Sequence, residues 1–183
     1  MVLKVAWAIT GAGDYLADSF AVMKQATEQY DLKLMVFLSK AGLQVVKMYN
    51  LVKELELLDP KYHVEKDANT PFLVAPLQRR KYHLVVAMPL TANSTAKIAH
   101  GIADTLVTNA IAQAQKTGVP IYVYPVDQKP GRVTTVLPSG EKLTLTSRQI
   151  DLDNVAKLRA MDGFFVLENP KEILAILESF PQE

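Results

Sequence analysis

Short apolar runs alternate with longer amphipathic stretches along most of the chain. The runs are rich in valine, isoleucine and leucine, as buried strands are, and between them apolar residues recur at the spacing of one helix face. Strands that alternate with helices predict an α/β fold, in which a parallel sheet lies between two layers of helices. The runs predict strands at 2–10, 32–39, 82–88, 118–126 and 163–169. The amphipathic stretches predict helices at about 15–30 and 41–58, a long one ending near 116, and shorter ones at 154–161 and 170–180.

Two segments depart from this alternation. Residues 132–148 have the pattern of two strands around the turn Leu-Pro-Ser-Gly-Glu-Lys, which predicts a β-hairpin inserted at about 131–149. Residues 70–77 are apolar but bracketed by prolines, so we expect a loop or an irregular strand there. No repeat or linker divides the chain, and we expect one domain over residues 1–183 with the hairpin as a C-terminal appendage.

Composition narrows the classes of function. The chain has 183 residues, a formal charge of +1 and no cysteine. The small net charge gives no general attraction to nucleic acid. The lack of cysteine excludes disulfides, thiolate-bound zinc, an iron–sulfur cluster held by this chain and a catalytic thiol. The apolar N-terminal run is too short to span a membrane and has no signal-peptide pattern, so we expect a cytoplasmic protein that does not bind membranes.

Three polar turns follow predicted strands, at residues 10–14 (TGAGD), 39–42 (SKAG) and 89–97 (PLTANSTAK). The carboxyl ends of parallel strands lie at one edge of a sheet, and open α/β sheets bind ligands at that edge. Each turn places small or hydroxyl residues before a helix, and helix N-termini attract phosphate groups. A tight turn or a helix cap explains each turn alone, but the three together favour a phosphorylated cofactor, most simply a flavin.

Residues 89–110, PLTANSTAKIAHGIADTLVTNA, resemble the PASANT segment and following helix of the homo-oligomeric flavin-containing cysteine decarboxylase superfamily. The TGAG and FLSKAG segments match the same superfamily in the expected order. The resemblance implies a flavodoxin-like (Rossmann-like) fold that binds FMN, usually at the interfaces of a trimer-based homo-oligomer. It also implies that the first turn approaches the flavin chain, that the second contacts the phosphate, and that the third lines the ring and ribityl group. The implied cofactor-binding residues are Thr10, Gly11, Ala12, Gly13, Ser39, Lys40, Thr91, Ala92, Asn93, Ser94, Thr95 and Lys97.

Departures from the superfamily pattern point away from decarboxylation. Its decarboxylases carry a catalytic histidine before the motif, where this chain reads NTPFLVAP. The opening segment at 7–23 instead resembles archaeoflavoproteins and FMN-dependent dihydromethanopterin reductases. That branch implies an oxidoreductase that passes electrons from a carrier such as ferredoxin to a small acceptor such as a pterin, with no catalytic side chain assigned. Two alternatives stay open: a phosphopantothenoylcysteine decarboxylase or flavin prenyltransferase on the same fold, and a non-catalytic flavin-binding subunit.

A few further residues have secondary interpretations. Asp14 fits a helix cap better than a substrate contact, His83 fits a structural position, and His100 fits a packing or surface position. The basic segment Arg79–Lys81 fits a solvated turn, although a positive patch also steers acidic ferredoxins. The hairpin at 132–148 is a candidate contact for a redox partner or a neighbouring subunit.

Overall fold

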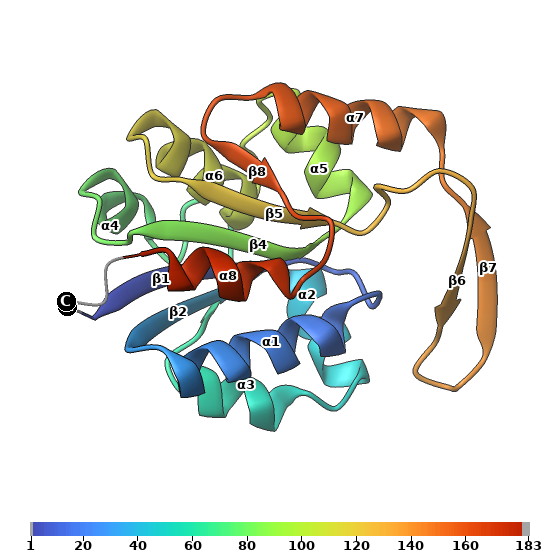
Figure 1. Ribbon diagram of the computed structural model, residues 1–183, viewed down its shortest axis with the longest axis horizontal. Coiled ribbons are helices and arrows are strands. Elements are labelled where there is room, and N and C mark those ends of the chain that lie inside the picture. Colours follow the sequence, from blue (N-terminus) through green and yellow to red (C-terminus); the bar gives the residue numbers. More distant parts are fainter. Residues whose placement is uncertain (1, 181–183) are drawn as a thin grey trace.

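The computed structural model of the chain describes residues 2–180 and confirms the α/β fold, with helices on both faces of a parallel sheet and a separate hairpin (Figure 1). The strands are β1 (Leu3–Ile9), β2 (Leu32–Leu38), β3 (His63–Val64), β4 (Leu84–Leu90), β5 (Ile121–Pro125), β6 (Arg132–Val136), β7 (Lys142–Thr146) and β8 (Phe164–Val166). The helices are α1 (Leu16–Gln29), α2 (Lys40–Met48), α3 (Val52–Leu58), α4 (Val74–Gln78), α5 (Ala92–Ala99), α6 (Leu106–Lys116), α7 (Gln149–Ala160) and α8 (Glu172–Glu178).

The main sheet has six strands in the order β3-β2-β1-β4-β5-β8, and every neighbouring pair is parallel. Apart from the short edge strand β3, this is the strand order of flavodoxin-like folds. The order reverses between β1 and β4, so the topological switch point lies at the carboxyl ends of these two strands. The fold therefore marks the same edge at which the polar turns were predicted to gather.

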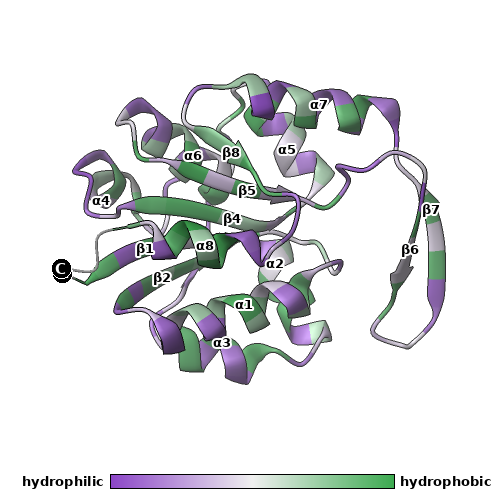
Figure 2. Cartoon of the chain, viewed as in Figure 1, coloured by the Kyte–Doolittle hydropathy of each residue, from purple (hydrophilic) through white to green (hydrophobic). Residues whose placement is uncertain are grey.

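Alternate residues of each central strand enter different apolar layers, as the two-residue period of a strand requires. Val5, Trp7 and Ile9 pack in the layer that also contains α1, α3 and α8, whereas Ala6 and Ala8 pack in the layer with α4 to α7. Figure 2 shows the central strands as almost continuously hydrophobic, which is typical of strands covered on both faces. Trp7 is fully buried, and its indole N–H donates to the Met88 carbonyl oxygen (2.7 Å), which links β1 to β4.

Two predicted helices are each split in the structure. The predicted helix 41–58 becomes α2 and α3, because Asn50 adopts a left-handed conformation (φ 58°) between them. The predicted long helix ending near 116 becomes α5 and α6, because Gly101 (φ 70°) ends the first and Thr105 caps the second. In both cases the apolar residues keep their helical spacing across the break, although the backbone leaves the helical conformation there.

Smaller corrections concern local structure. The segment 70–77 was predicted to be a loop or an irregular strand, but its second half forms the short helix α4. Asp14 was predicted to cap a helix, but Tyr15 occupies that position in a left-handed conformation (φ 59°), and no side chain of the part of the chain that the structure describes caps α1. The structural interpretation of His83 is confirmed, since it precedes β4 and its Nδ1 accepts from the Lys4 N–H (2.9 Å).

The β6–β7 hairpin forms its own two-stranded antiparallel sheet and stands beyond the carboxyl ends of β4 and β5 (Figure 1). Val136, Leu143 and Leu145 are 40–52% exposed on it. A two-stranded hairpin is only marginally stable alone. Among the described residues, no helix is long and apolar enough to cross a membrane.

Candidate functional site

The side chain of Thr10 joins the first and third turns at the switch point. Its hydroxyl donates to the Pro89 carbonyl oxygen (2.9 Å) and accepts from the Thr91 N–H (2.9 Å). Thr10 directly follows β1, and Thr91 directly follows β4. Thr10 is buried, so water competes little for these bonds. The prediction that the two turns meet at one edge of the sheet is confirmed.

The second turn lies against the first because two glycines allow a close approach. The Ser39 N–H donates to the Ile9 carbonyl oxygen (3.1 Å), and the Ser39 Oγ accepts from the Gly42 N–H (2.9 Å), which caps α2. A Cβ on Gly42 would lie 2.5 Å from the Ile9 carbonyl oxygen, and one on Gly11 would lie 2.7 Å from the Ala41 Cβ. The N-terminus of α2 is therefore held directly beside the end of β1.

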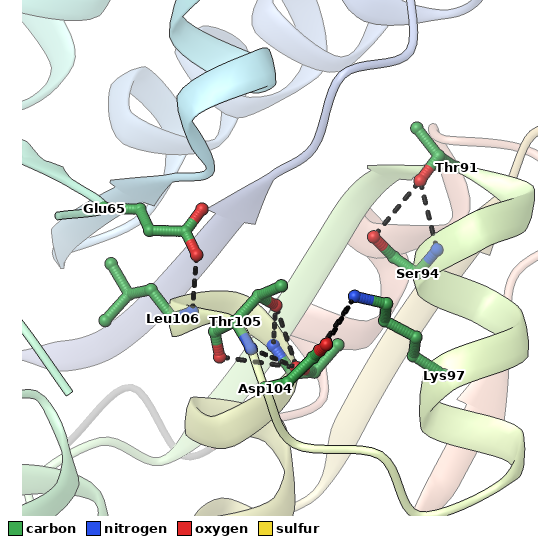
Figure 3. Close-up of polar contacts among 8 residues, drawn as sticks. Glu65, Thr91, Ser94, Lys97, Asp104, Thr105 and Leu106 are labelled. Carbon is green, nitrogen blue, oxygen red and sulfur yellow. Dashed lines mark hydrogen bonds and ion pairs between the residues drawn. The ribbon is translucent and has the colours of Figure 1, made fainter. Parts of the chain in front are cut away.

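The third turn opens α5 with a hydroxyl cap (Figure 3). Thr91 Oγ1 accepts from the Ser94 N–H (3.2 Å) and donates to the Ser94 Oγ (3.1 Å). Asn93 is exposed in the first helical turn, whereas Thr95 is buried. The Thr95 hydroxyl has no hydrogen-bond partner among residues 2–180. Unpartnered buried hydroxyls are uncommon in native proteins, and this one lies in the helix that begins at the third turn.

Glu65 ties the N-termini of α2 and α6 to this edge, and sequence analysis did not single it out. It directly follows β3, and its two carboxylate oxygens accept from the Lys40 N–H (3.2 Å) and the Leu106 N–H (3.1 Å). The bond to Leu106 is visible in Figure 3. A carboxylate is favourable at a helix N-terminus, and here one carboxylate serves both α2 and α6. The only sequence signal was an acidic residue after a strand of two residues. A strand of that length is too short to be recognised in a sequence.

Not every residue implied by the resemblance is equally available to a ligand. The Lys97 ammonium group lies 2.8 Å from both carboxylate oxygens of Asp104, so it is engaged in an ion pair (Figure 3). The side chain of Ala12 is buried in the core, and only its backbone can face a ligand. Lys40 is exposed beside the Ser39 cap.

Tyr49 connects the hairpin to the first turn. Its hydroxyl donates to the Val136 carbonyl oxygen (3.1 Å), and a Cβ on Gly13 would lie 2.5 Å from the same hydroxyl oxygen. Burial and the nearby charge of Asp14 raise the pKa of Tyr49 above its usual value, so the hydroxyl stays a hydrogen-bond donor. Hairpin and turn are therefore in contact through one side chain.

The assembled edge has the chemistry of a phosphate cradle. The N-termini of α2, α5 and α6 reach it, and helix N-termini carry partial positive charge. Glu65, Ser39 and Thr91 already accept from one or two N–H groups of these helices, and the caps fix where the helices begin. Hydroxyl groups of Thr10, Ser39, Thr91 and Thr95 lie at the same edge or in the helix that begins there. This donor set suits an anionic group that is bound and held.

Comparison with known proteins decides the family. The model of the Flavoprotein family matches residues 2–181. The chain belongs to the flavoprotein family. The resemblance inferred from the motif at 89–110 is thereby confirmed for nearly the whole chain.

Relatives of this flavoprotein include two from Methanocaldococcus jannaschii. An uncharacterised protein is 48% identical, with 96% of this chain and 95% of the relative covered. A dihydromethanopterin reductase (acceptor) is 33% identical, with 94% of each covered. Among solved structures, Burkholderia xenovorans DmrB in complex with FMN, a cubic protein cage for redox transfer, is 33% identical with a TM-score of 0.78. The alignment covers 96% of this chain and 93% of that one.

The structure of this flavoprotein fits the chemistry of a flavin phosphate. Glycines 11 and 42 stand where a Cβ would collide with neighbouring atoms, so the first turn and the α2 N-terminus pack closely together within the cradle. Thr95 supplies a buried hydroxyl in α5 that has no partner within the described range 2–180. Both observations are independent of the motif match.

The basic segment of the flavoprotein lies at the amino ends of the strands, opposite the carboxyl ends that carry the three turns. Arg79, Arg80 and Lys81 are exposed and precede the amino end of β4. A cavity of about 270 Å³ at these strand ends is lined by four lysines, Lys4, Lys33, Lys61 and Lys81, among other residues. The strand β4 separates these basic residues from the Thr91 turn.

Proposed function

We propose that this flavoprotein binds FMN at the cradle and works as an FMN-dependent oxidoreductase that reduces a pterin, with dihydromethanopterin as the model acceptor. The observation that carries the proposal is the joining of the three turns at the switch point by Thr10 and Ser39. The FMN-bound relative DmrB and the dihydromethanopterin reductase relative, each 33% identical, support the cofactor and the reaction class. Electrons would come from a separate carrier such as ferredoxin.

In this proposal the chain positions the cofactor, and the flavin when bound supplies the hydride chemistry. Ser39 and the N-terminus of α2 hold the phosphate, where the helix dipole favours negative charge. Thr91, Asn93 and the N-terminus of α5 hold the ribityl chain and the ring edge. Lys97 supports the site indirectly, because its ion pair with Asp104 fixes the end of the loop between α5 and α6.

The assembly we propose is a trimer-based homo-oligomer, in which a neighbouring subunit completes the flavin site. The relative DmrB is a cubic cage. The hairpin supports the same arrangement, because it stands beyond the cradle with exposed Val136, Leu143 and Leu145. Apolar side chains that are half exposed on an isolated hairpin gain stability when a second subunit covers them.

The basic segment is a less direct candidate for docking the electron donor. β4 spans seven residues, which at ~3.3 Å per residue puts Lys81 roughly 20 Å from the Thr91 turn of the same subunit. These residues would serve an acidic carrier where the assembly brings them near a neighbouring flavin. Charge reversal at Arg79, Arg80 and Lys81 would then slow reduction and weaken its salt dependence. An unchanged rate and salt dependence would exclude that docking site.

The decisive test is spectroscopic. The purified protein, reconstituted with FMN, should be yellow, bleach when reduced ferredoxin is added without oxygen, and recolour with dihydromethanopterin. A yellow protein that ignores the donor would favour the decarboxylase, prenyltransferase or non-catalytic alternative. A colourless protein that cannot be reconstituted with FMN would refute the proposed cofactor site.

Replacing Asn93 with leucine tests the third turn. Losing a hydrogen bond to a polar group of the ligand costs about 1–3 kcal/mol. We expect FMN affinity to fall about 5- to 150-fold, measured by quenching of flavin fluorescence. The matched control is Gln29→Leu at the exposed end of α1, which should leave the affinity unchanged. Equal affinities for both variants would show that Asn93 does not face the flavin.

A further inference from the structure

Asp127 lies beside the third turn. It follows β5, which is the neighbour of β4 on the side away from β1. The last residue of β5, Pro125, pairs with Leu90 of β4. The Val126 N–H donates to the Leu90 carbonyl oxygen (3.0 Å), so the chain just before Asp127 is bonded to the residue just before Thr91. The backbone at Asp127 therefore lies at the same edge of the sheet as the proposed flavin cradle.

The neighbours of Asp127 are engaged in structural bonds, but Asp127 is not. Asp151 receives two bonds from the Arg148 guanidinium group (2.8 and 2.7 Å). Gln128 donates to the Leu167 carbonyl oxygen (2.9 Å) and accepts from Arg159. The half-buried Asp127 carboxyl group has no hydrogen bond or ion pair with any residue in 2–180. Because no residue in 2–180 binds this carboxyl group, it is free to contact a bound ligand.

The surroundings of Asp127 raise the pKa of its carboxyl group. Burial raises the pKa of Asp127 above its ordinary value, and the negative charges of Asp151 from α7 and Asp14 from the first turn raise it further. The positive charge of Arg148, at the end of the hairpin, lowers the pKa by a smaller amount. An acid with a raised pKa keeps its proton closer to neutral pH, which is the property a general acid needs.

Resting on the proposed function, we propose that Asp127 is the proton donor for the acceptor of this flavoprotein. The C=N bond of the dihydropterin takes two electrons and one hydrogen at carbon, as a hydride from the reduced flavin, which becomes oxidised. The Asp127 carboxyl group gives its proton to the nitrogen of the same bond, so that C=N becomes CH–NH. The carboxylate left behind takes a proton from solvent before the next turnover.

The test separates the two half-reactions of the FMN-loaded protein. Flavin prereduced with dithionite is mixed with dihydromethanopterin, and recolouring is followed by stopped flow. Asp127→Asn, which keeps the shape and loses the proton, should slow recolouring about 100-fold or more, the usual contribution of a general acid. Its FMN affinity, flavin spectrum and bleaching by the donor should stay within about twofold of wild type, since none of these needs the proton.

Two controls and a direct titration complete the experiment. Asp127→Glu should restore part of the rate, and Asp153→Asn, an exposed carboxylate on α7, should change nothing. The wild-type rate should fall as pH rises through the pKa of Asp127, and Asp127→Asn should lose that dependence. Carbon-13 NMR of the flavin-free protein should show Asp127 titrating above the ordinary aspartate range, and this readout does not depend on activity.

The outcomes distinguish the inference from the proposed function. If wild type recolours and Asp127→Asn recolours at the same rate, the role of Asp127 is overturned and the proposed function stands. Loss of FMN binding in Asp127→Asn would assign the residue to the cofactor site instead and also overturn the role. No recolouring of wild type by dihydromethanopterin would overturn the proposed function, and the inference would fall with it.

Discussion

Replacing Gly42 with alanine is expected to lower the free energy of unfolding by about 1–3 kcal/mol and to weaken FMN binding at least about tenfold. Inside a helix, alanine is normally favoured over glycine by up to about 1 kcal/mol. Here the new Cβ would lie 2.5 Å from the Ile9 carbonyl oxygen, a backbone atom that cannot rotate away. Helix α2 must shift away from β1, and its capped N-terminus, with Ser39, would leave the position proposed to hold the phosphate.

The measurements are chemical denaturation of the flavin-free protein and a fluorescence titration with FMN, both at one protein concentration because assembly affects stability. Gln44→Ala is the matched control, since it changes an exposed residue of the same helix. We expect its free energy of unfolding to stay within about 0.5 kcal/mol of wild type. A Gly42→Ala protein that is more stable than wild type and binds FMN normally would show that α2 is not held tightly against β1.

Replacing Thr10 with valine is expected to destabilise the protein by about 1–3 kcal/mol and to impair FMN binding. Valine has nearly the same shape, so the change removes the hydroxyl group and leaves packing almost intact. The Thr91 N–H loses its acceptor, and the Pro89 carbonyl oxygen keeps only its 3.3 Å bond from the backbone of residue 10. The first and third turns would no longer be joined by a side chain at the switch point.

Thr10→Ser is the informative control because serine retains the hydroxyl group and loses only a methyl group. It should recover most of the FMN affinity and much of the stability lost in Thr10→Val, in the same denaturation and titration experiments. If valine and serine behave alike, the hydroxyl bonds to Pro89 and Thr91 contribute little, and the turns are held by packing alone.

Much of the fold was predictable because its signals are local. The five longest predicted strands all appear, with ends within a few residues of those expected. Short runs of β-branched and leucine residues are typical of buried strands. The hairpin at 132–148 was also predicted, since a Pro-Ser-Gly turn between alternating segments specifies its own pairing. These elements need no information from distant parts of the chain.

The errors occurred where backbone conformation or tertiary pairing overrode the apolar spacing. Asn50 and Gly101 interrupt amphipathic stretches that continue on either side, so each predicted long helix is two helices. The strand His63–Val64 was missed because a two-residue strand has no periodicity, and it exists only by pairing with β2. Glu65 was missed with it, since its role depends on where that strand ends.

By itself, the sequence determined most of the elements, their order, and the three polar turns that identify the flavoprotein family, because hydrophobic period and turn residues act over a few neighbouring positions. Only the tertiary structure decided what those turns contact. Thr10 bonds to the Thr91 turn, Glu65 joins α2 to α6, and Asp127 stands beside the third turn with no side-chain partner among residues 2–180. The physical reason is that these contacts join residues tens of positions apart, and their distance in space is set by the strand order, which no local pattern specifies.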